Sequence, residues 1–169
     1  SRKPSKQEIR LKEVLQEQVR PLFNFQIFPN LKQLNIDCKD IIFPFGSFVL
    51  DGFALLTNLE NLRVETWKRA RGWHLIFEGL LKLPRLKNLS LDIPVIYDDE
   101  WKLLIRFANS DVNLESLSLK VLLPLFHQGT YLKQSLFLED FISSLQTQIK
   151  LKNLDLSFPY LSVVTFSKG

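Results

Sequence analysis

The segment LKNLSL at residues 86–91 decides the fold of this chain, because its pattern of L-x-x-L-x-L recurs along the sequence. Four more segments share the pattern, with Leu, Ile or Val in the last place: LKQLNI (31–36), LENLRV (59–64), LESLSL (114–119) and LKNLDL (151–156). Their first leucines lie 28, 27, 28 and 37 residues apart, which is too regular a spacing for chance. Such a period indicates an architecture made by stacking one supersecondary unit.

Each unit predicts a strand followed by a helix. Alternation of apolar and polar residues is typical of a strand with one buried face, and in the first unit Leu34, Ile36 and Cys38 alternate with Gln33, Asn35 and Asp37. Between the strands, apolar residues fall at helical spacing: Trp73, Ile76, Phe77 and Leu80; Trp101, Leu104, Ile105 and Ala108; and Phe137, Phe141 and Leu145. The acidic run 98–100 stands where a helix start favours carboxylates, so we expect a helix to begin there.

These segments resemble the leucine-rich repeat family, in its helix-containing, ribonuclease-inhibitor-like class with repeats of about 28 residues. The resemblance covers residues 28–158. It implies an α/β fold, a horseshoe-shaped leucine-rich repeat solenoid with a parallel sheet on the concave face and helices on the convex face. The family's Asn or Cys five residues after the second leucine is missing, so the repeats are degenerate; the column reads Lys39, Trp67, Pro94, Leu122 and Pro159.

The two ends of the chain give further expectations. Residues 5–8 (SKQE) form a capping box, which predicts a helix within residues 1–22 that either caps the first repeat or belongs to a preceding one. Residues 23–169 then form the repeat domain of about five repeats. The absence of an initiator Met and of a signal peptide predicts a piece of a longer protein. The apolar run 158–166 predicts an open edge that further chain or a partner seals.

Composition limits the class of protein. Hydrophobic residues make up 46% and charged residues 24%, which favours a folded chain, and no run of 18 apolar residues predicts a membrane span. The single cysteine, Cys38, fits a reducing compartment, so we expect an intracellular protein of the cytoplasm or nucleus. The net charge of +4 allows acidic partners without requiring nucleic acid.

Residues suited to catalysis are few. His74, His127 and Cys38 lie far apart in sequence and lack metal-ligand spacing, and no glycine-rich phosphate loop is present. His74 and Glu78 are four residues apart on a predicted helix, which fits either a solvated pair or an acid–base pair. We therefore expect a protein that is not an enzyme and has no cofactor or metal.

The outward positions of the predicted strands form three polar columns across the sheet. The columns are Gln33, Asn61, Asn88, Ser116 and Asn153; Asn35, Arg63, Ser90, Ser118 and Asp155; and Asp37, Glu65, Asp92, Lys120 and Ser157. They predict either a hydrophilic docking face for a protein or a face that is merely solvated. Since the columns contain no aromatic residue, they lack the usual anchors of a binding hot spot.

Two loops deviate from the repeat. Residues 67–73 place Lys68, Arg69 and Arg71 between Trp67 and Trp73, a pattern that suits an acidic protein, a nucleic acid or a solvated turn. The insertion at 121–131 is apolar and contains Phe126, which either packs on a neighbouring surface or anchors a partner. Its proline and glycine argue against a regular helix.

These patterns favour a non-enzymatic scaffold or adaptor module that binds a protein through its concave face and strand-exit loops. The alternative is a nucleic-acid-binding subunit that uses the basic loop 67–73. The expected contact residues are Asn35, Asp37, Asn61, Arg63, Glu65, Ser90, Asp92, Ser118, Lys120 and Asp155 on the sheet, with Trp67, Lys68, Arg69, Arg71 and Phe126 in the loops.

Overall fold

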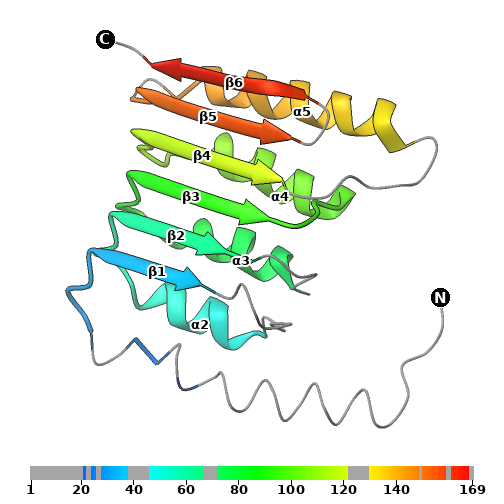
Figure 1. Ribbon diagram of the computed structural model, residues 1–169. Helices are drawn as coiled ribbons and strands as arrows, with labels where there is room; N and C mark the ends of the chain where they lie inside the picture. The colour runs from blue at the N-terminus through cyan, green and yellow to red at the C-terminus, as the bar shows by residue number, and fades with distance from the viewer. Residues whose placement is uncertain are drawn as a thin grey trace, which may run out of the picture.

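The computed structural model describes residues 21, 24, 25, 28–37, 46–66, 72–121, 130–148, 150–158 and 161–167. Within them, strands and helices alternate along the chain until the last two elements, which are both strands (Figure 1). The order is β1 (Gln33–Asp37), α2 (Phe48–Ala54), β2 (Asn61–Glu65), α3 (Trp73–Leu80), β3 (Asn88–Ile93), α4 (Asp98–Ala108), β4 (Ser116–Val121), α5 (Thr130–Gln146), β5 (Asn153–Phe158) and β6 (Leu161–Ser167).

The strands form one sheet in sequence order, from β1 at one edge to β6 at the other. Strands β1 to β5 are parallel, and each pairs with the next so that equivalent residues of the repeated segment stand side by side. Leu89, for example, pairs with Leu62 on one side and Leu117 on the other. The sequence prediction of five strands in this register is confirmed, and the fold is α/β.

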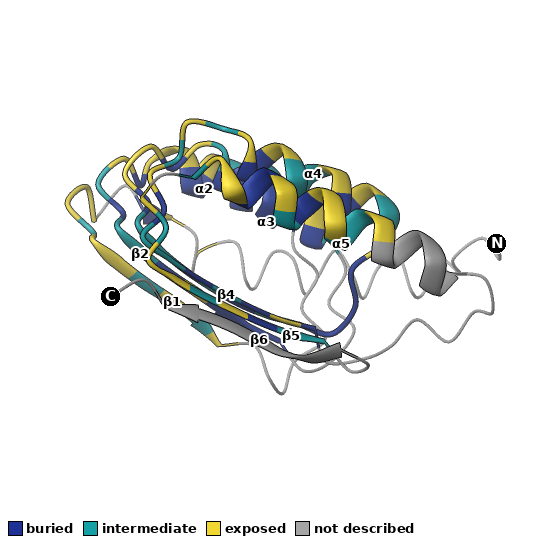
Figure 2. Ribbon diagram, turned by 90° about the horizontal axis from the view of Figure 1, so that it is seen from above, coloured by how far each residue is buried: buried dark blue, intermediate teal, exposed yellow. Residues whose placement is uncertain are grey.

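The helices α2 to α5 cover one face of the sheet, and the buried residues lie between the two layers (Figure 2). The helical stripes predicted from the sequence are confirmed. Trp73, Ile76, Phe77 and Leu80 of α3 are all buried, as are Trp101, Leu104 and Ala108 of α4 and Phe141 and Leu145 of α5. The two other predicted positions, Ile105 and Phe137, are half-buried and pack against this core. No helix within the described ranges has both the length and the apolar character needed to cross a membrane.

One glycine allows two helices to approach closely. A Cβ atom placed on Gly79 of α3 would lie 2.6 Å from Cδ2 of Phe53 on α2, well inside van der Waals contact. The ring of Phe53 is fully buried and has little room to move away. A glycine at this position therefore lets the α2 phenylalanine fill the space between the two helices.

Glu100 links the starts of two neighbouring helices. Its carboxylate accepts a hydrogen bond of 2.9 Å from the backbone N–H of Tyr97, just before α4, and another from the backbone N–H of His74 in α3. The expected helix start at residues 98–100 is confirmed, but Glu100 itself is buried. Burial raises the pKa of the Glu100 carboxyl above its usual value of 4.5, although both N–H groups favour the charged form.

The far end of the sheet has an additional strand. Leu161–Ser167 folds back as β6 and pairs antiparallel with β5, with a bulge between Leu156 and Phe158. This pairing covers the edge of β5 with the protein's own chain. The expectation that further chain or a partner seals the end formed by the apolar run 158–166 stays a prediction, and it now concerns the outer edge of β6.

Several sequence predictions fall outside the described residues. They concern almost all of the helix expected within 1–22, Cys38, His127 and all of the predicted loop contacts, Trp67, Lys68, Arg69, Arg71 and Phe126. Of the insertion 121–131, its last two residues belong to α5, which begins at Thr130.

The register predicts opposite responses on the two faces of β3. Leu89 is 2% exposed and belongs to the core, so Leu89→Ala should lower the free energy of unfolding by about 2–5 kcal/mol. The adjacent Ser90→Ala removes a half-buried hydroxyl from the other face and should change the free energy by only about 0.5 kcal/mol. Urea unfolding of both variants checks this, and similar losses would contradict the assigned faces.

Glu100 predicts a particular dependence of stability on pH. Since its pKa is raised in the folded state, its stabilising contribution is complete below pH 4.5 and is lost as the pH rises through the raised pKa. In Glu100→Gln the amide oxygen can still accept a hydrogen bond but does not titrate. Thermal unfolding between pH 4.5 and neutral pH should therefore show a smaller loss of stability in the variant. An unchanged slope would contradict the role assigned to this carboxyl.

Candidate functional site

The face of the sheet opposite the helices carries the three polar columns predicted from the sequence, and we call it the open face. Strand pairing aligns each column without a break from β1 to β5: Gln33–Asn61–Asn88–Ser116–Asn153, Asn35–Arg63–Ser90–Ser118–Asp155 and Asp37–Glu65–Asp92–Lys120–Ser157. In the described part of the chain, no helix or strand lies over this face (Figure 1). The predicted grouping of these residues is therefore confirmed.

Exposure differs along the columns. The three polar residues of β1 are exposed, and so are Lys120 of β4 and Asn153 and Asp155 of β5. The polar residues of β3 between them, Asn88, Ser90 and Asp92, are all half-buried. On β2, Arg63 is also exposed. The polar groups of β3 are therefore the least accessible part of the open face, and the groups that a partner reaches most easily stand on β1, β2, β4 and β5.

Lys120 and Asp155 place opposite charges near one end of the open face. Lys120 pairs across the strands with Ser157 and has Asp92 as its neighbour on the other side. Asp155 stands beside Ser118, whose hydroxyl donates a hydrogen bond of 3.5 Å to the carboxylate. The arrangement offers a cation, a carboxylate and hydroxyl groups within neighbouring positions of two strands, which can pair with a hydrogen-bonding segment of either charge.

Glu65 corrects one sequence expectation. It was expected on the solvated face, available to a basic segment of a partner, but it is only 4% exposed. The guanidinium of Arg63, two residues earlier on the same strand, donates a hydrogen bond and forms an ion pair with the Glu65 carboxylate. Arg63 remains exposed, yet its charge is engaged in holding a buried carboxylate. The alternation of residues along β2 predicted the face on which Glu65 lies, but it did not predict that Glu65 is buried.

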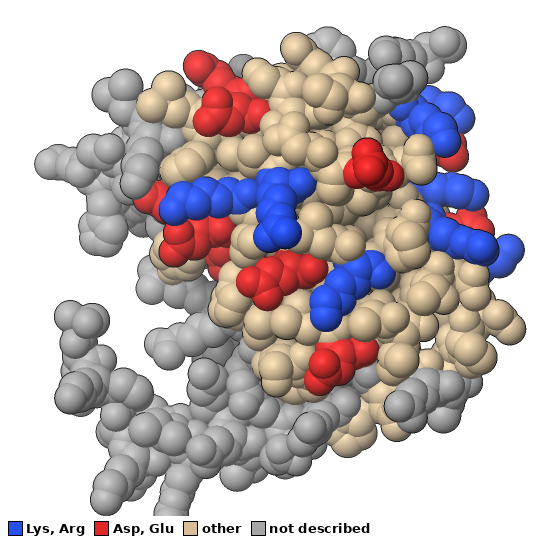
Figure 3. Space-filling view, turned by 180° about the vertical axis from the view of Figure 1, so that it is seen from behind, with Lys and Arg blue, Asp and Glu red and all other residues tan. Residues whose placement is uncertain are grey.

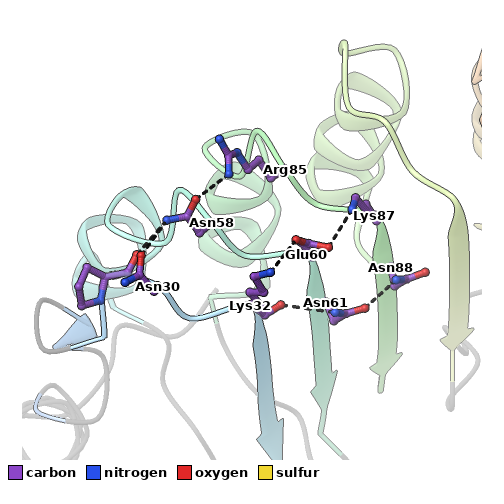
Figure 4. Close-up of polar contacts among 9 residues, drawn as sticks. Asn30, Lys32, Asn58, Glu60, Asn61, Arg85, Lys87 and Asn88 are labelled. Carbon is purple, nitrogen blue, oxygen red and sulfur yellow. Dashed lines mark hydrogen bonds and ion pairs between the residues drawn. The ribbon is translucent and has the colours of Figure 1, made fainter.

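A row of charged side chains that was not predicted from the sequence lies at the end of the sheet where β1 to β5 begin. The second residue of each repeated segment alternates in sign, and we call this row the charge ladder: Lys32, Glu60, Lys87, Glu115 and Lys152. The ammonium of Lys87 lies 2.8 Å from Glu60, and that of Lys32 lies 3.8 Å from Glu60 (Figure 4). The ammonium of Lys152 lies 2.9 Å from Glu115. The alternating signs are visible in the sequence, at the position immediately before the first polar column.

The ladder alters the ionisation of its members. The hydrogen bond and charge of Lys87 hold the pKa of Glu60 below 4.5, and Lys152 does the same for Glu115. In return, Glu60 raises the pKa of Lys87 above 10.5. These shifts favour the charged forms of Glu60, Lys87 and Glu115, so the ladder is better suited to holding neighbouring units together than to receiving a ligand.

Side-chain amides add a second set of contacts at the same edge. Asn88 donates to the side-chain oxygen of Asn61, and Asn61 donates to the carbonyl of Lys32 at 3.4 Å (Figure 4). In the preceding turns, Arg85 donates to Asn58 at 2.9 Å, and Asn58 donates to the carbonyl of Pro29 at 3.2 Å. These polar bonds tie the first three units to one another.

Within the described ranges, no three His, Cys, Asp or Glu side chains come together as metal ligands. His74 is exposed and Glu78 is half-buried on α3. Seen from the helix side, acidic and basic side chains are interspersed and neither sign forms a continuous patch (Figure 3). Among the described residues, the aligned polar columns of the open face are therefore the stronger candidate for a binding site.

Arg63 and Glu65 predict a coupled effect on stability. Arg63→Ala removes one partner of a buried carboxylate and should lower the free energy of unfolding by about 1–3 kcal/mol. Glu65→Gln in the same chain removes the buried charge and should recover part of the loss. Denaturant unfolding of both single variants and the double variant measures the coupling. Additive losses would show that the two side chains act independently.

Comparison with known proteins gives no family assignment. No family model, no curated protein and no solved structure matches this chain.

Proposed function

We propose that this chain is a non-enzymatic protein-interaction module of the leucine-rich repeat type, whose open face is the concave surface of a solenoid. It acts as a scaffold or adaptor for a protein partner. The support for the repeat type is the recurring L-x-x-L-x-L segment, with each copy on a strand in register with the next. A reducing intracellular compartment, cytoplasmic or nuclear, belongs to the same proposal.

The observation that carries the proposal is the alignment of polar side chains on a face that no described element covers. Five strands hold Asn, Ser and charged residues at the fixed spacing of a parallel sheet, about 4.8 Å from one strand to the next. On the other face the same strands are buried against four helices, so the polar positions rest on a packed layer. This combination gives a rigid hydrophilic surface.

Binding to such a surface works by preorganisation. The backbone positions of Asn35, Ser118 and Asp155 are already fixed by strand pairing, so little entropy is lost at these positions when a partner docks. Serine and asparagine side chains are short, which keeps the remaining cost of ordering small. Specificity then comes from the match between partner groups and the two exposed ends of the face, near Asp37 and near Lys120 and Asp155.

Lys120 provides the sharpest test of this surface. It is exposed on β4, and Lys120→Glu reverses a charge at one end of the open face without touching the core. The matched control is Lys82→Glu, which makes the same charge change at an exposed residue beyond α3. Partners are recovered from nuclease-treated native cell extract with each chain and quantified by mass spectrometry. We expect recovery of specific proteins to fall about tenfold or more with Lys120→Glu, a loss of about 1.4 kcal/mol, and to persist with Lys82→Glu.

Each other outcome decides against part of the proposal. If both variants recover as much protein as the wild-type chain, Lys120 does not belong to the binding surface. If both variants lose recovery to the same extent, net charge alone controls the binding. Material that disappears after nuclease treatment favours the nucleic-acid alternative. In that case charge reversal at Lys68, Arg69 and Arg71 should abolish recovery, with a steep dependence on salt.

A further inference from the structure

The two edges of the sheet differ in charge. A strand at the edge of a sheet leaves a row of backbone N–H and C=O groups free to pair with another chain. At one edge, β1 has Asp37 within the strand and three exposed polar residues. At the other, the segment LSVVTFS of β6 contains no charged residue, no proline and no glycine. Only the β6 edge therefore lacks the residues that usually prevent edge-to-edge pairing.

The geometry of β6 suits regular pairing. Its last four residues, 164–167, pair with β5 without interruption, and the irregularity in the pairing lies in the first half of β6, between Leu161 and Val164. Three consecutive residues, Val163, Val164 and Thr165, are β-branched and favour extended backbone. Within the described part of the chain, β6 is the last strand in the sheet order and pairs on one side only.

We propose that the β6 edge pairs with the β6 edge of a second copy of this chain, which gives a two-fold symmetric dimer. Two identical strands can pair antiparallel about a two-fold axis, since each presents the same groups to the other. With the axis at Val164, all seven residues of each strand find a partner. Because β6 carries no charge, no like charges meet across the axis.

The charges favour pairing of β6 with β6 of a second copy over a head-to-tail contact between β6 and β1. Pairing of β6 with β1 of another copy would be a heterologous contact, which repeats without closing unless its rotation forms a ring. It would also place Asp37 at the junction. Pairing of β6 with itself closes after two copies and joins two six-stranded sheets into one sheet of twelve strands. Both open faces then lie on the same side of the joined sheet.

Charge-swapped variants test the register. With the axis at Val164, position 163 of one copy stands opposite position 165 of the other. Variant one carries Val163→Lys and Thr165→Lys, and variant two carries Val163→Glu and Thr165→Glu. Each variant alone brings like charges together and should be monomeric. An equimolar mixture brings opposite charges together and should restore a dimer, which also shows that both variants fold.

Analytical ultracentrifugation over about a hundredfold range of concentration gives the readout. The wild-type chain should approach twice its mass of 19.8 kDa as the concentration rises. A mass of 19.8 kDa throughout overturns the proposal whatever the variants do. Dimers of either charged variant alone also overturn it, because another surface must then join the copies. Species that grow beyond two copies indicate head-to-tail pairing and reject the closed dimer.

Discussion

The structure depends on the exact lateral alignment of five parallel strands, and the edge where these strands begin holds that alignment. There a single backbone carbonyl in each unit accepts two N–H groups from the next one. The carbonyl of Lys32 accepts from Glu60 and Asn61, and that of Glu60 accepts from Lys87 and Asn88, in each case at 2.9 Å. The carbonyls of Lys87 and Glu115 continue the series. A slip of one residue would break these bonds and move the leucines out of the core.

The same residues that supply these carbonyls carry the alternating charges. Ion pairs accompany the carbonyl bonds at three of the four steps, from Lys32 to Glu60, from Glu60 to Lys87 and from Glu115 to Lys152. Backbone and side chain then favour the same neighbour, and this agreement is characteristic of sequences that specify one structure. The family that the sequence resembles bonds adjacent turns through an Asn or Cys column, which this chain lacks. In this chain, the bifurcated carbonyl bonds and the charge ladder join neighbouring units at the opposite ends of the strands.

The sequence predicted the strands and their faces because leucine spacing and alternation are local patterns. Leu62, Leu89 and Leu117 could be aligned from the sequence alone, and this alignment also placed the polar residues next to them in columns. The depth of Glu65 could not be derived in this way. It depends on what packs around the end of β2 and on an arginine two residues away, and neither is encoded in period-two alternation. The direction of β6 was missed for a related reason, since an apolar run does not reveal which way its strand runs.

The charge ladder restricts how such a chain can change its length. Its signs run plus, minus, plus, minus, plus from Lys32 to Lys152. Duplication or deletion of one unit within the series places two like charges side by side at the new junction, where the carbonyl bonds force them close. Insertion or removal of two units preserves the alternation. Internal duplication in this architecture is therefore electrostatically favoured in pairs of units, so that the number of strands in the parallel series stays odd while both ends stay basic.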